Sequence, residues 1–197
     1  MRDPFILKDG DYWYLTGTMC ENSETPPGGV PLYKSKDLKT WTYIGLMAVR
    51  PDDSQNKWYQ RRFWAPEIFQ RNGKYYITVN CCKATPDWSD HGILICEADN
   101  IEGPYKILND GKPLALGNDA HLFCDDDGKV YLYASDIWAA EIDLGTMMFL
   151  TSRKNIIKPV KGSAAWNGQR EGVGFEGPYV VKRDNILYVL FYLGARV

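Results

Sequence analysis

The chain has 197 residues, which suits one domain or two and is enough to bury a sizeable core. Lysine and arginine number 23 and aspartate and glutamate 25, so the net charge is -2, and no basic patch predicts a nucleic-acid partner. A hydrophobic share of 45% excludes a disordered chain, and the longest apolar run near the C-terminus, 186–193, is too short to cross a bilayer. The composition therefore predicts a globular protein that has neither nucleic acid nor a membrane as its partner.

Strand signals follow one another along the chain. An Asx-Gly pair precedes an aromatic or β-branched run at Asp9-Gly10, Asn72-Gly73 and Asp127-Gly128. Such pairs adopt the positive φ angles that two-residue hairpin turns need. Further strand patterns occupy 30–41 and 92–98, and no long stretch has a helical period. The sequence therefore predicts an all-β fold.

One pattern occurs four times. Its copies begin at Asp3, Ala65, Asp119 and Glu176, which lie 62, 54 and 57 residues apart. Each copy consists of a short strand, a turn and an aromatic strand, and further strand patterns follow between the copies. About 57 residues hold one four-stranded sheet with its loops, and a series of such sheets around an axis is a β-propeller. We therefore expect residues 1–197 to form a single β-propeller domain.

The length of the chain predicts an incomplete propeller. Dividing 197 residues by about 57 gives roughly three and a half blades, whereas closed propellers have at least four. The fourth copy stops after two strands, and its last strand, 186–193, would offer an apolar edge. We therefore expect a C-terminally truncated domain whose last edge is covered by a partner or by self-association.

Three of the four copies begin with an acidic residue. In a propeller the first strand of each blade lines the central channel, so Asp3, Asp119 and Glu176 are expected to meet at one channel mouth. Like charges that lie close together repel each other, so acids that are kept together at this electrostatic cost indicate a functional site. Glycosidases need a carboxylate base and a protonated carboxyl acid on either side of the scissile bond. A third carboxylate keeps such an acid protonated, because a like charge disfavours ionisation.

The motifs around these residues resemble those of glycoside hydrolase family 43, five-bladed propellers that act on arabinose- and xylose-containing polysaccharides. The segments that carry the resemblance are, in chain order, Arg2-Asp3-Pro4 with Tyr12-Trp13-Tyr14-Leu15, Phe63-Trp64-Ala65-Pro66-Glu67, Asn118-Asp119-Ala120-His121-Leu122-Phe123 with Asp125-Asp126-Asp127-Gly128, and Phe175-Glu176-Gly177-Pro178. The four motifs stand in the family's order and at blade spacing, so the resemblance covers essentially the whole chain.

The resemblance implies three catalytic roles. Asp3 is expected to be the general base that activates water, and Glu176 the general acid that protonates the leaving oxygen. Asp119 is expected to keep Glu176 protonated and to orient it. The family inverts the anomeric carbon, which predicts that the carboxyl groups of Asp3 and Glu176 lie roughly 6.5–9.5 Å apart.

Substrate contacts are also implied. Trp64, with Phe63 beside it, is expected to form a wall of the sugar pocket. His121 follows Asp119 by two residues on a strand and should face the same side, where it would bind substrate or serve a structural role. The implied reaction is the hydrolysis of α-L-arabinofuranosyl or β-D-xylosyl linkages in plant cell-wall polysaccharides or their oligosaccharides. No cofactor is expected; a structural calcium ion is compatible with the family, but no residue of this chain indicates one.

Other interpretations remain open. The missing blade favours a non-catalytic or degenerate propeller fragment that binds carbohydrate or a protein. Residues 172–177 match GxGxxG, but a strand pattern follows where a dinucleotide site needs a helix. We expect a solvated loop around His91 and, for most of the five cysteines, buried thiols. The start of the chain has no signal-peptide pattern, so localisation is left open: secreted or periplasmic if a leader has been removed, and cytoplasmic otherwise.

Overall fold

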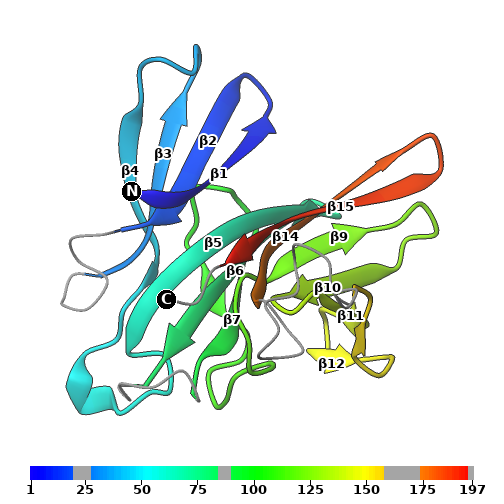
Figure 1. The fold of residues 1–197 in the computed structure, drawn as a ribbon. Coiled ribbons are helices and arrows are strands. Elements are labelled where there is room, and N and C mark those ends of the chain that lie inside the picture. Colours follow the sequence, from blue (N-terminus) through cyan, green and yellow to red (C-terminus); the bar gives the residue numbers. More distant parts are fainter. Residues whose placement is uncertain (20–27, 84–89, 158–173, 195–197) are drawn as a thin grey trace. The chain divides into compact units, whose positions relative to one another are not determined.

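The computed structural model describes residues 1–19, 28–83, 90–157 and 174–194 (Figure 1). Cys20 and Gly172, which belong to patterns named above, lie outside these ranges. The chain divides into two compact units, Met1–Gly117 and Asn118–Val197, and each is described by itself. Within the described ranges, the helical structure is limited to the 3₁₀ turn η1 (Asp53–Gln55), and no helix has the length and apolarity to span a membrane.

The first sheet of unit 1 is an antiparallel meander in the order β1-β2-β3-β4. Its strands are β1 (Arg2–Asp9), β2 (Tyr12–Thr18), β3 (Gly29–Ser35) and β4 (Thr42–Val49). Asp9 pairs with Tyr12 across the first turn, where Gly10 has a φ of 54°. The hairpin predicted at this Asx-Gly pair is therefore confirmed, and strands that are neighbours in sequence are neighbours in the sheet, as in a propeller blade.

The second sheet of unit 1 repeats this topology in the order β5-β6-β7-β8. Its strands are β5 (Arg61–Arg71), β6 (Lys74–Cys82), β7 (Gly92–Ala98) and β8 (Lys106–Ile107). The turn between the first two has φ angles of 51° at Asn72 and 75° at Gly73. Two positive φ angles in a two-residue turn match the right-handed twist of the strands that it joins, which explains why an Asn-Gly pair stands here.

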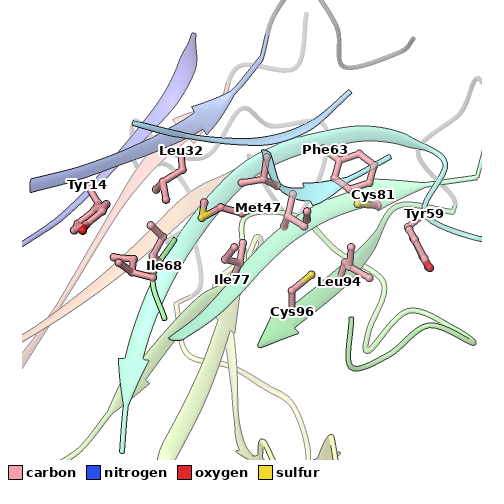
Figure 2. Close-up of a cluster of buried hydrophobic side chains, with 14 residues drawn as sticks. Tyr14, Leu32, Met47, Tyr59, Phe63, Ile68, Ile77, Cys81, Leu94 and Cys96 are labelled. Carbon is pink, nitrogen blue, oxygen red and sulfur yellow. The ribbon is translucent and has the colours of Figure 1, made fainter. Parts of the chain in front are cut away.

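Both sheets contribute to the core of unit 1 (Figure 2). Leu32 comes from the first sheet and Ile77 from the second, and their exposed fractions are 1% and 0%. Cys81 and Cys96 lie in the same cluster, so the expectation of buried thiols is confirmed for these two residues. Burial raises the pKa of the Cys96 thiol to about 12, because an apolar surrounding disfavours the thiolate, and it raises the pKa of Cys81 as well.

Unit 2 contains the third and fourth repeats. The third forms a sheet in the order β12-β11-β10-β9, with a further short strand on β11. These strands are β9 (His121–Cys124), β10 (Val130–Ala134), β11 (Trp138–Asp143), β12 (Met148–Phe149) and β13 (Lys154–Asn155). The fourth repeat is the hairpin of β14 (Gly174–Arg183) and β15 (Ile186–Gly194). All four predicted repeats therefore begin a sheet.

Candidate active site

The backbone takes a left-handed turn at the start of each repeat. The φ angle is 49° at Asp3, 44° at Ala65 and 51° at Asp119. In the fourth repeat the left-handed residue is Gly177, with a φ of 60°, directly after Glu176. Left-handed φ angles are costly for L-residues other than glycine and asparagine or aspartate, and such conformations concentrate at functional sites. The same backbone feature thus marks all three predicted acids or their immediate neighbour.

Asp3 is tied to the end of the neighbouring strand. The Thr18 hydroxyl donates a hydrogen bond to Asp3 Oδ2 at 2.6 Å. Thr18 Oγ1 also accepts a hydrogen bond from the backbone N–H of Ala65 at 2.8 Å, and Thr18 is fully buried. One hydroxyl group therefore connects Asp3 at the start of the first sheet with the Trp-Ala-Pro segment of the second.

Trp64 lies beside two guanidinium groups. The guanidinium carbon of Arg2 lies 5.8 Å from the centroid of the indole ring and that of Arg62 lies 4.9 Å from it, both within the range of cation–π attraction. Arg62 Nη1 lies 2.6 Å from Nε2 of His91, whose ring is 5.6 Å from that of Trp64. The sequence-based prediction of a solvated loop at His91 is wrong for this side chain, because contacts with these residues leave it 4% exposed.

Asp119 accepts two hydrogen bonds on the same carboxylate oxygen. The Ser135 hydroxyl and the backbone N–H of Gly177 each donate to Asp119 Oδ2 at 3.1 Å. The carboxylate therefore bridges the end of β10 and the beginning of β14. Two donors on one oxygen limit the rotation of the carboxyl group.

Glu176 stands on β14 opposite Tyr192 on β15. The Tyr192 hydroxyl donates a hydrogen bond to Glu176 Oε2 at 2.8 Å. The strand register shifts between Glu176 and Tyr179, so the bulge that contains Gly177 directly follows the acid. A methyl group at Gly177 would come within 2.7 Å of the Tyr192 ring, so glycine serves both the backbone angle and the approach of the tyrosine.

The two remaining predicted contact residues are buried. Phe63 is 0% exposed and belongs to the buried core cluster of unit 1, and its contact with substrate stays a prediction. His121 is 6% exposed, and its ring lies 4.8 Å from the ring of Tyr179. His121 therefore packs within unit 2, consistent with the structural alternative, and its contact with substrate stays a prediction.

The structure groups the predicted residues within each unit. In unit 2, Asp119 bonds to the backbone N–H of Gly177, the residue that follows Glu176. In unit 1, Thr18 links Asp3 to the segment that carries Trp64. Sequence reasoning missed the hydroxyl donors Thr18, Ser135 and Tyr192. They lie 15, 16 and 16 residues after their acids, and this regular spacing was the signal that would have found them.

The fold defines the class of protein first. Each of the four repeats begins a sheet, and in the first three sheets strands that are neighbours in sequence lie side by side. This arrangement defines an all-β propeller protein. A structure described as a thermostable family-43 glycoside hydrolase matches with a TM-score of 0.79 and 24% identity, covering 98% of this chain and 64% of that one. Residues 1–194 match the sequence model of glycosyl hydrolases family 43, and the chain belongs to this family.

Named relatives come from several bacteria. A xylosidase/arabinosidase of Butyrivibrio fibrisolvens is 31% identical over 205 residues, which cover 95% of this chain and 36% of that protein. An extracellular endo-α-(1→5)-L-arabinanase 2 of Bacillus subtilis (strain 168) is 26% identical, with 98% and 44% covered. The chain thus spans between about a third and a half of the length of these two relatives.

Proposed function

We propose that the chain carries the catalytic residues of a glycoside hydrolase that inverts the anomeric carbon of α-L-arabinofuranosyl or β-D-xylosyl linkages. The substrates are plant cell-wall polysaccharides or the oligosaccharides derived from them, and residues 1–197 belong to a single catalytic propeller domain. Membership of family 43 supports this proposal, as do relatives named as a xylosidase/arabinosidase and as an arabinanase.

One observation carries the proposal. The three acids that match the family's motifs all stand at left-handed turns that begin a repeat, and Asp119 bonds to the backbone of Gly177, which directly follows Glu176. Packing alone does not require acidic side chains at these positions, since Ala65 occupies the same position in the second repeat. Glycoside hydrolysis needs one carboxyl group as base and one as acid, and the family's motifs assign these roles to Asp3 and Glu176.

In the proposed reaction, Asp3 is the general base. Its carboxylate removes a proton from a water molecule while the water oxygen attacks the anomeric carbon. Glu176 donates its proton to the leaving oxygen as the glycosidic C–O bond breaks, so that the product has the opposite anomeric configuration. Asp119, which accepts hydrogen bonds from the Ser135 hydroxyl and the Gly177 N–H, is the carboxylate that modulates and orients Glu176 in this proposal.

The sugar pocket in this proposal includes Trp64, whose partly buried indole would stack on a pentose ring, and His121 as a polar neighbour. The reaction uses no cofactor, because two carboxyl groups supply both proton transfers. In the part of the chain that the structure describes, no group of three or more His, Cys, Asp or Glu side chains could hold a metal ion.

The experiment compares the native chain with Glu176→Ala and Glu176→Gln on 4-nitrophenyl β-D-xylopyranoside and 4-nitrophenyl α-L-arabinofuranoside. We expect the native chain to turn over at least one substrate and loss of the general acid to lower kcat about 10²–10⁴-fold. Glu141→Ala, a change of another half-buried glutamate of unit 2, is the matched control and should keep native activity. Proton NMR of the first product should show the inverted anomer.

Two outcomes contradict the proposal. Turnover that survives both substitutions removes Glu176 from the mechanism. No turnover by the native chain on either substrate, or on arabinan and xylan oligosaccharides, supports the alternative of a non-catalytic propeller that binds carbohydrate or a protein.

A further inference from the structure

Each of the three acids accepts a hydrogen bond from a hydroxyl group of its own sheet. The donors are Thr18 for Asp3 at 2.6 Å, Ser135 for Asp119 at 3.1 Å and Tyr192 for Glu176 at 2.8 Å. The separation in sequence is 15, 16 and 16 residues. Three different residue types thus supply the same group, an O–H donor, at the same place in three repeats.

The topology explains the regularity. Thr18 is the last residue of β2, Ser135 directly follows β10, and Tyr192 lies near the end of β15. Each of these strands is the second of its sheet and pairs antiparallel with the strand that the acid precedes or begins. The end of the second strand therefore always lies beside the start of the first, where the acid stands.

We infer that Thr18, Ser135 and Tyr192 are positioning residues that each orient one carboxyl group of the site, an inference that rests on the proposed function. A hydroxyl that donates to one oxygen of a carboxyl group limits its rotation and favours proton transfer at the other oxygen. On Asp3, the bond to Oδ2 assigns the proton of the attacking water to Oδ1. On Glu176, the bond to Oε2 makes that oxygen the acceptor and assigns the acidic proton to Oε1.

The assignment predicts different kinetic effects for the two ends of the reaction. Tyr192→Phe removes the donor to the general acid, which matters only when the leaving group needs a proton. We expect kcat to fall about tenfold on a xylobioside or arabinobioside and to stay nearly native on a 2,4-dinitrophenyl glycoside. Thr18→Val removes the hydroxyl that orients the general base, Asp3, which the hydrolysis of every substrate needs. We therefore expect kcat to fall about tenfold on the disaccharide glycoside and on the dinitrophenyl glycoside alike, with little change in KM.

Matched controls separate positioning from general stability. Thr16→Val removes another fully buried hydroxyl of β2, which donates to the carbonyl of Pro31 at 2.8 Å and not to an acid. Tyr188→Phe removes a phenol four residues before Tyr192, on the same face of β15. Both controls should keep native kcat on all substrates, even where Thr16→Val lowers the melting temperature as much as Thr18→Val does.

A second readout needs no turnover. Carbon-13 NMR of the carboxyl carbons should show that Thr18→Val moves the Asp3 signal, Ser135→Ala the Asp119 signal and Tyr192→Phe the Glu176 signal, each more than the control substitutions do. Unmoved signals, or equal losses of kcat on good and poor leaving groups for Tyr192→Phe, overturn the inference. If Glu176→Ala keeps full activity while these signals move as expected, the catalytic proposal fails and the positioning contacts stand.

Discussion

At the scale of single residues, the site depends on backbone conformations that most side chains avoid. Asp3 and Asp119 tolerate the left-handed region because a short polar side chain can form local hydrogen bonds there. Ala65 has no such group, and the bond from its N–H to Thr18 Oγ1 helps to hold it. The strained residues therefore coincide with contacts to the proposed catalytic groups, as expected where position matters more than stability.

Gly177 gives the sharpest test at this scale. Gly177→Ala adds a methyl group within 2.7 Å of the Tyr192 ring at a φ of 60°, so the tyrosine must move away from Glu176. We expect a destabilisation of more than about 1–2 kcal/mol, the usual cost of the left-handed conformation for an L-residue, together with a loss of glycosidase activity. Urea denaturation and kcat measured on the same preparations would check both effects.

Gly73→Ala is the control for this prediction. Gly73 has a φ of 75°, and a methyl group there meets no atom within 4 Å, so only the backbone cost applies. A Gly177→Ala variant that behaves like Gly73→Ala in both stability and turnover would show that the approach of the tyrosine is unimportant.

At the scale of the elements, the last hairpin closes with an unusual turn. The turn between β14 and β15 has φ angles of 52° at Asp184 and 61° at Asn185, so two Asx residues form it without glycine.

The hairpin of β14 and β15 is strongly apolar at the surface. Its large exposed side chains are Tyr179, Val181, Ile186, Leu187, Tyr188, Leu190, Phe191 and Tyr192. Among the described residues β15 pairs with β14 alone, so β15 is the edge strand that the sequence predicted.

This edge predicts self-association of the 197-residue chain. An apolar strand at the edge of a sheet is a template for pairing with a second copy, and a lysine on it opposes such pairing. We expect Leu190→Lys to shift the chain toward the monomer at micromolar concentrations, as measured by light scattering after size exclusion. Leu150→Lys is the control, since Leu150 is equally exposed, at 59% against 57%, but lies outside the hairpin. An equal effect of both substitutions would exclude the β15 edge.

At the scale of the whole molecule, the chain comprises two compact units, each with two of the four repeats. The first contains Asp3 and Trp64, and the second contains Asp119 and Glu176, so the proposed reaction needs residues from both. In the proposed function, a single propeller domain would bring them together. The separation predicted between the carboxyl groups of Asp3 and Glu176, roughly 6.5–9.5 Å, depends on how the whole molecule combines these residues.

A single domain predicts a single unfolding transition. In a propeller each sheet packs on its neighbours, so the loss of one exposes the next. In a urea titration, labelling of the buried Cys81 and Cys96 thiols reports on unit 1, and hydrogen exchange in β10 reports on unit 2. We expect both signals to change at the same urea concentration. Transitions separated by more than the error of their midpoints would mean that the two units are separate domains.

The sequence by itself determined the all-β class, the four repeats and the acids that begin three of them. Asx-Gly pairs and alternating aromatic runs act through dihedral preferences over a few residues, so they can be read without the fold. Only the tertiary structure decided that Phe63 belongs to the core, that His91 is buried beside Arg62, and that hydroxyl groups hold the acids. Burial and hydrogen bonding depend on which strands pair and in which register, and residues 15 or 16 positions apart meet only after the hairpins form.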